Sequence, residues 1–133
     1  MQAFDTNVLV RVLIGDDPRQ TPVAEEAFLR HARGEGVFVS QVVLAELGWV
    51  LRSGYGLSRA QVHERLARLV RTRGVFVEAV QVTLDALERY RNGSADLADL
   101  LILGRAAQEQ ATPLLTFDCK LAHEDGAELL EAP

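Results

Sequence analysis

Short apolar runs alternate along the chain with longer segments in which apolar residues recur every three or four positions. The short runs are rich in β-branched and aromatic residues, which predicts buried strands, and they cover residues 2–4, 37–39, 75–77, 114–117 and 127–130. The longer segments have the spacing of amphipathic helices and cover residues 8–14, 22–33, 41–52, 58–73, 82–91 and 94–110. Because helices separate the strands, the pattern predicts an α/β fold with a parallel sheet covered on both faces.

Polar residues at the helix boundaries support these limits. Thr21 is the expected N-cap of a helix that has proline at its first position. Ser58 and Gln61 have the spacing of a capping box, and Ser40 is the expected cap of the helix after the second strand. No repeat, low-complexity tract or linker interrupts the pattern, so we expect residues 1–133 to form one domain.

Cysteine usage and hydropathy limit the cellular setting. Cys119 is the only cysteine and has no internal disulfide partner, which fits a reducing cytoplasm. No apolar stretch approaches the roughly 20 residues of a membrane span. The first residues lack a basic region followed by an apolar stretch, so no signal peptide is expected. We therefore expect a cytoplasmic protein with no membrane partner.

Four carboxylates lie in unusually apolar surroundings. Glu46 and Asp99 are each the only charge within an apolar run, while Asp5 follows the first predicted strand and Asp118 follows the fourth. An unpaired ionised carboxylate is so costly to bury that such residues are nearly always paired, protonated or bound to metal. Few cations lie nearby in the sequence, so one shared metal site is the simplest explanation.

The order of the elements predicts that these carboxylates converge. Ligands of open parallel sheets bind beyond the carboxyl ends of the strands, where Asp5 and Asp118 are expected. Glu46 lies about two turns into the helix after the second strand. Asp96 and Asp99 share one face near a helix start, whose positive end favours anions. All five side chains are expected to face one pocket.

The ligand types indicate which metal the pocket would hold. Oxygen ligands without cysteine or histidine select Mg²⁺ or Mn²⁺ rather than zinc, and the three histidines match no zinc-binding spacing. Such an ion polarises a phosphate oxygen and lowers the pKa of a bound water. Phosphodiester hydrolysis is the reaction that this arrangement serves best.

Each carboxylate also has a purely structural interpretation. Asp5 and Asp96 are candidate helix N-caps, and Asp118 is a candidate turn residue. Mid-helix positions offer no free backbone donor, so the alternative for Glu46 and Asp99 is a buried ion pair. The nearest arginines along the sequence are Arg52 and Arg105.

Four short motifs together resemble the acidic motifs of the PIN domain, in the family's order and at comparable spacing. They are Phe4–Leu9, Ala45–Glu46, Ala98–Ile102 and Leu115–Asp118. The resemblance runs from Gln2 to Leu130. The compact, single-domain form is most similar to the VapC-type toxins of prokaryotic toxin–antitoxin pairs.

The resemblance implies a metal-dependent endoribonuclease with a three-layer α/β/α sandwich around a central, mostly parallel sheet of four to five strands. It implies that Asp5, Glu46 and Asp99 form the core acidic triad, with Asp118 as a more variable fourth member. Asp96 matches an acid found in only some members, so the direct ligand is either Asp96 or Asp99. The small polar positions that hydrogen-bond these carboxylates or the metal's waters correspond to Thr6, Asn7 and Thr116.

The resemblance also implies partners and a regulator. Proteins of this type are usually homodimers that use Mg²⁺ or Mn²⁺, cut RNA and are held inactive by a cognate antitoxin. The net charge of −5 argues against a broad basic surface for nucleic acid. The segment from Arg52 to Arg73 is rich in arginine, however. It is a contact to RNA phosphates, a surface for an acidic antitoxin segment, or the solvated face of a helix.

Other functions fit the sequence less well. A PIN-like interaction module for protein or RNA, without significant catalysis, would be expected to lose acidic positions, and all four are present. A phosphatase of the haloacid dehalogenase type requires Asp-x-Asp after its first strand, where this chain has Asp5-Thr6-Asn7. A DNA-cutting enzyme that resembles flap nucleases would need additional arch and helical insertions.

Overall fold

Helices and strands follow one another in the predicted order. The computed structural model describes the whole chain, Met1–Pro133. Its strands are β1 (Gln2–Ala3), β2 (Val37–Val39), β3 (Val75–Val77), β4 (Leu114–Thr116) and β5 (Ala127–Leu129). Its α-helices are α1 (Thr6–Ile14), α2 (Gln20–Arg33), α3 (Gln41–Trp49), α4 (Arg59–Arg71), α5 (Val80–Asn92), α6 (Leu97–Gln108) and α7 (Cys119–Ala122), and a π-helical segment, η1 (Val50–Gly54), extends α3. The predicted α/β fold is therefore confirmed, with the short α7 as an addition.

The strands form two parallel sheets instead of one. β1, β2 and β3 lie in that order, with Gln2 opposite Val37 and Val37 opposite Val75. β4 pairs with β5 in a separate sheet, with Leu114 opposite Ala127. The parallel direction agrees with the prediction, but the five strands do not join into one central sheet. Hydrophobic patterning locates strands along the chain and does not specify which strands pair.

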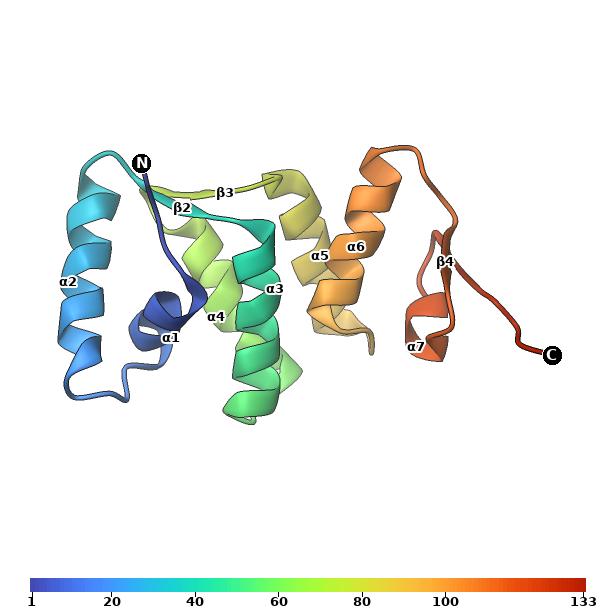
Figure 1. Cartoon of the computed structure of the whole chain (residues 1–133), viewed down its shortest axis with the longest axis horizontal. Coiled ribbons are helices and arrows are strands. Elements are labelled where there is room, and N and C mark those ends of the chain that lie inside the picture. The colour runs from blue at the N-terminus through green and yellow to red at the C-terminus, as the bar shows by residue number, and fades with distance from the viewer.

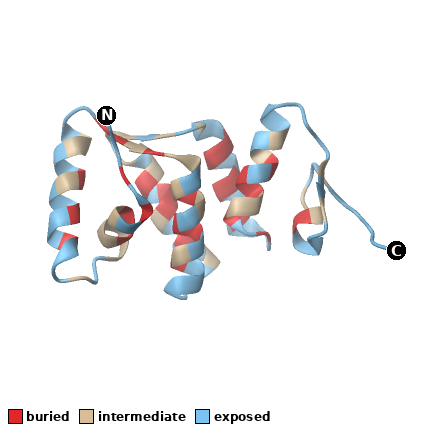
Figure 2. Cartoon of the chain, in the orientation of Figure 1, coloured by how far each residue is buried: buried red, intermediate tan, exposed pale blue.

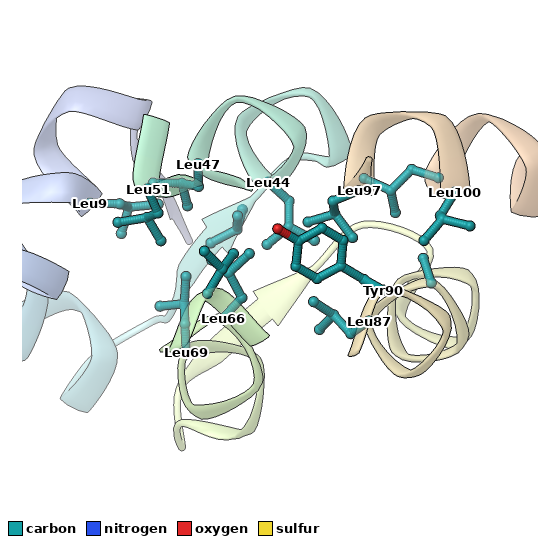
Figure 3. Packing of buried hydrophobic residues seen from close by; sticks show 14 of the residues in the cluster. Leu9, Leu44, Leu47, Leu51, Leu66, Leu69, Leu87, Tyr90, Leu97 and Leu100 are labelled. Carbon is teal, nitrogen blue, oxygen red and sulfur yellow. The ribbon is translucent and has the colours of Figure 1, made fainter. Parts of the chain in front are cut away.

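The main core lies between the three-stranded sheet and the helices around it. Figure 3 shows leucines from different helices packed together, among them Leu44 and Leu47 of α3, Leu66 of α4 and Leu97 of α6. Leu44, Leu47 and Leu66 are completely buried, and each such side chain contributes roughly 1.5–3 kcal/mol to stability. Buried residues are sparse in the last part of the chain (Figure 2).

β4, α7 and β5 form a small C-terminal unit, residues 114–129, that lies beyond α6 and away from the three-stranded sheet (Figure 1). It is anchored to α5 and α6. The Arg89 guanidinium donates to the backbone oxygen of Asp125 over 3.2 Å. A Cβ on Gly126 would lie 3.5 Å from a methyl carbon of Leu103, so the two are in close contact. Leu121 of α7 is buried in the same apolar cluster as the main core.

Local capping explains several helix boundaries and corrects one. Ser58 and Gln61 form the predicted capping box at the start of α4, and Ser40 accepts a hydrogen bond from the Val43 N–H as predicted. Thr21 is not an N-cap, because α2 begins at Gln20. The Asp17 carboxylate instead accepts the backbone N–H groups of Arg19 and Gln20 at the start of α2, and these bonds lower the pKa of Asp17.

The connection between α5 and α6 is held by Arg59 of α4. Its guanidinium donates to the backbone oxygens of Tyr90 and Ala95, each at 2.7 Å, and lies 4.0 Å from the centre of the Tyr90 ring. Burial raises the pKa of the Tyr90 hydroxyl, opposed by the charge of Arg59. Arg59 therefore positions the start of α6, where two of the candidate carboxylates lie.

Helices α3 and α6 approach each other closely at a glycine. A Cβ added to Gly48 would lie 2.9 Å from Cδ2 and 3.2 Å from Cβ of Leu97. Contacts this short are not tolerated by packed side chains, so only glycine permits this spacing. The contact places the first turn of α6 beside the last turn of α3.

Candidate functional site

The first candidate carboxylate, Asp5, follows β1 and begins α1. Its backbone is extended, and its Oδ1 accepts the N–H of Thr6 over 2.7 Å. This is the N-cap role that the sequence left open. The side chain is exposed at the end of the strand, so capping does not remove it from solvent or from a ligand.

Thr6 links Asp5 to Glu46. Thr6 is buried, and its hydroxyl donates to Oε1 of Glu46 over 3.0 Å. A residue of α1 thus fixes a carboxylate of α3 that is 40 positions away in the sequence. Asp5 and Glu46 line one shallow pocket with Asn7, Arg11 and Tyr55. We call Asp5 and Glu46 the first acidic group.

Arg11 is the member of this pocket that sequence reasoning missed. It lies four residues after Asn7 on α1, so the two side chains share one face of the helix. This spacing is the feature of the sequence that could have indicated Arg11. Its guanidinium lies 3.7 Å from a carboxylate oxygen of Asp16 and donates to the side-chain oxygen of Gln20 over 2.8 Å. The positive charge is therefore held at the rim of the pocket by side chains that are not candidate ligands.

Glu46 is not buried, contrary to the expectation from its apolar run. It lies on an exposed stripe of α3 together with Val42 and Trp49, which are 70% and 67% exposed. The buried face of the same helix carries Leu44 and Leu47. The alternative of a buried ion pair is also wrong for Glu46, because this side chain is exposed and forms no ion pair. The guanidinium of Arg52 donates to the backbone oxygen of Leu57 instead.

Asp96 and Asp99 lie at the start of α6. Asp96 occupies the N-cap position, but its side chain makes no capping hydrogen bond. Asp99 is half-buried, and burial is the main cause that raises its pKa, followed by the charges of Asp96 and Asp118. Arg105 pairs with Glu109 and not with Asp99, so the alternative of an ion pair is also wrong here.

Asp118 follows β4 and begins α7. Its Oδ1 accepts the N–H of Lys120 over 2.9 Å, and its own N–H donates to the hydroxyl of Thr116 over 3.0 Å. Thr116 thus supports the backbone of the candidate ligand rather than its carboxylate. Because Asp118 raises the pKa of Asp99, its charge lies within electrostatic reach of α6. Asp96, Asp99 and Asp118 are here called the second acidic group.

The two acidic groups do not meet within one chain. Asp5 and Glu46 belong to the three-stranded part of the molecule, and they are not among the charges that shift the pKa of Asp99. No three carboxylate, histidine or cysteine side chains lie close enough together to hold one metal ion. The expectation of one pocket for all five carboxylates is therefore not met by the single chain, although their oxygen chemistry suits Mg²⁺ or Mn²⁺.

The arginine-rich segment has mixed roles in the structure. Arg59 is structural, and Arg65 donates to the backbone oxygen of Leu13. Arg68 and Arg71 remain exposed and line a pocket between α4 and α5 with His63 and Arg91. This basic pocket shares no lining residue with the pocket at Asp5.

The fold and the pattern of strand-end carboxylates define the class of protein. The model of the PIN domain family matches residues 3–126. The chain therefore belongs to the PIN domain family, whose members are in general nucleases, typically use divalent metals and bind RNA. A search of curated proteins gave no match. No helix has the length and apolar character that crossing a bilayer would require.

Proposed function

We infer that the protein is a Mg²⁺- or Mn²⁺-dependent endoribonuclease that hydrolyses RNA phosphodiester bonds. The observation that carries this proposal is the presence of carboxylates at the carboxyl ends of two parallel strands, Asp5 after β1 and Asp118 after β4, in a PIN domain. Glu46, Asp99 and Asp96 supply further oxygen ligands from helices. A hard cation held by such oxygens would polarise the scissile phosphate and supply an activated water.

The other polar residues have supporting roles in this proposal. Thr6 orients the Glu46 carboxylate through its hydroxyl, and Thr116 holds the turn that carries Asp118. Asn7 lines the pocket beside Asp5. Arg11 at the same pocket is placed to attract the phosphates of an RNA strand.

We also propose the biological setting that the resemblance to VapC-type proteins implies. The enzyme would be the toxin of a toxin–antitoxin pair in the cytoplasm, would form a homodimer, and would be inhibited by a cognate antitoxin. The exposed arginines of the basic pocket, Arg68, Arg71 and Arg91, suit an acidic antitoxin segment or RNA phosphates, since both carry negative charge.

A second candidate function is supported by the geometry of the single chain. Because no three candidate ligands lie close enough for one ion, the protein would be a PIN-like interaction module for RNA or protein without significant catalysis. The two functions differ in what they require. The nuclease needs a divalent metal and the first acidic group, whereas the module needs neither.

Cleavage of total cellular RNA by the purified protein tests the proposal. We expect discrete products with Mg²⁺ or Mn²⁺, none with EDTA, and a loss of at least about 100-fold in rate for Asp5→Asn. Asp85→Asn, which changes an exposed aspartate of α5 outside both acidic groups, is the matched control and should cleave normally. Metal-independent products, or full activity of Asp5→Asn, would contradict the nuclease and favour the interaction module.

A further inference from the structure

The free edge of β1 is open to another strand. The N–H of Gln2 donates to Gly36 over 2.9 Å, and the N–H of Phe4 donates to Phe38 over 3.2 Å. Successive residues of a parallel strand direct their backbone groups to opposite sides. The N–H and C=O of Ala3 therefore point away from β2, and no strand of the chain lies on that side.

The same is true of β4. Its Leu114 N–H donates to Gly126 and its Thr116 C=O accepts from Leu130, both at 2.7 Å. The C=O of Leu115 and the N–H of Phe117 therefore point away from β5. β1 and β4 are thus edge strands with a free side, as β3 and β5 are at the opposite edges of the same two sheets.

The two edges fit each other in one register that also aligns the carboxylates. With Ala3 opposite Thr116, the Ala3 N–H faces the C=O of Leu115 and the Ala3 C=O faces the N–H of Phe117. The two sequences then match at the next two positions, because Phe-Asp follows Ala3 and Phe-Asp follows Thr116. Paired strands lie about 4.8 Å apart, so this register places Asp5 beside Asp118.

Large apolar side chains are exposed around both acidic groups. Val42 and Trp49 flank Glu46 on α3, Phe117 precedes Asp118 and is 70% exposed, and Ile102 follows Asp99 by one turn and is 53% exposed. Apolar surface that gathers at one functional region marks an interaction surface. In this chain the exposed apolar side chains lie around the two acidic groups, which do not meet within the single chain.

Pairing β4 with β1 of the same chain would require the fold to rearrange. In the chain itself α6 separates the C-terminal unit from β1 (Figure 1). The turn after α6 is held by backbone hydrogen bonds, such as Ala111 N–H to the Ala106 oxygen at 2.8 Å. Docking β4 on its own β1 would break this turn and the contacts of Gly126 and Asp125 with α6 and α5.

We propose that two copies of the chain assemble by reciprocal exchange, with β4 of each copy paired with β1 of the other. The first acidic group of one copy then meets the second acidic group of its partner, so that each carboxylate site is built from two chains. A two-fold arrangement pairs the β1 and β4 edges of both copies and leaves only the outer edges of β3 and β5 unpaired. The role of the carboxylates in this assembly rests on the proposed nuclease function, whereas the strand pairing does not.

The mass in solution tests the strand pairing without reference to activity. Light scattering should give twice the chain mass of 14.6 kDa for the wild type, and a single chain mass for Ala3→Pro, which removes the outward N–H while leaving the bonds to β2. Ala3→Val keeps the N–H and is the matched control that should remain dimeric, with circular dichroism confirming that both variants fold. A monomeric wild type, or an Ala3→Pro variant that stays dimeric, would overturn the exchange.

Mixing two inactive variants tests the shared site. Asp5→Asn and Asp99→Asn should each be inactive, but after the copies are allowed to re-associate the mixture should regain about a quarter of wild-type cleavage. This value follows because half of the dimers contain both variants and each of these has one intact site of two. No recovery from an active wild type would overturn the shared site. If the wild type itself does not cleave RNA, the nuclease proposal fails, and the mass of Ala3→Pro still decides the exchange.

Discussion

At the scale of single residues, Thr6 connects local structure to the candidate chemistry. It is the first residue of α1, its N–H is capped by Asp5, and its hydroxyl reaches Glu46. One buried residue therefore contacts two carboxylates, Asp5 through its backbone N–H and Glu46 through its hydroxyl. A residue in this position is expected to matter for geometry even though it carries no charge.

Thr6→Val is expected to weaken the site without changing its shape. The substitution keeps the branched side chain but removes the donor to Glu46, so stability should fall by about 1 kcal/mol and cleavage by roughly 10-fold. Urea unfolding and the RNA cleavage rate measure the two effects. Thr6→Ser retains the hydroxyl and is the control; a Thr6→Val enzyme with unchanged cleavage would show that Glu46 needs no such orientation.

Residue environments were the least predictable part of the site. The apolar run around Glu46 predicts burial, yet α3 buries Leu44 and Leu47 and exposes Val42, Glu46 and Trp49. A helix that is apolar all round gives no sign of which face meets solvent, because the periodicity that would reveal it is missing. Only the position of α3 against the sheet and α6 decides the exposure of Glu46.

At the scale of elements, the connection between α5 and α6 determines where the second acidic group lies. Arg59 satisfies two backbone oxygens there and packs on the ring of Tyr90. Gly48 sets the distance between α3 and α6 from the other side. The start of α6 is thus held by contacts with two helices that are distant in sequence.

Arg59→Gln should be among the most destabilising changes outside the leucine core. A neutral side chain cannot serve both carbonyl groups or replace the contact with the aromatic ring, so the free energy of unfolding should fall by about 2–3 kcal/mol. Urea titration followed by circular dichroism measures this loss. Arg68→Gln removes an arginine of the same helix whose ion pair with Glu64 is exposed, and it should change stability by no more than about 0.5 kcal/mol.

A similar loss for Arg59→Gln and Arg68→Gln would contradict this role of Arg59. It would mean that the bonds to Tyr90 and Ala95 are replaced by water at little cost. The comparison is informative because both arginines lie on α4 and differ mainly in what their guanidinium groups contact.

At the scale of the whole molecule, the division into two sheets is the feature with the largest consequence. It leaves the strand edges at Ala3 and Leu115 unpaired and separates the two acidic groups. Exposed strand edges promote pairing with other chains unless they are covered. Assembly and the completion of the candidate site are therefore linked in the proposed dimer.

This link predicts that thermal stability depends on protein concentration. A dimer that forms only from folded chains is favoured by mass action, so the midpoint of wild-type unfolding should rise as the concentration is increased 100-fold. The midpoint of Ala3→Pro should stay constant over the same range. Differential scanning calorimetry measures both, and a constant midpoint for the wild type would indicate that its folded chain does not associate.

The sequence by itself determined the order and type of the elements, the capping box at Ser58 and the family. These depend on short-range periodicity, on hydrogen bonds between neighbouring residues and on motifs read along the chain. The sequence also indicated the oxygen chemistry of Asp5, Glu46, Asp99 and Asp118. It did not determine which strands pair, which carboxylates are exposed, or that they form two groups. Those features depend on contacts between residues far apart in the chain, and hydrophobic patterning shows that a face is apolar without showing what covers it.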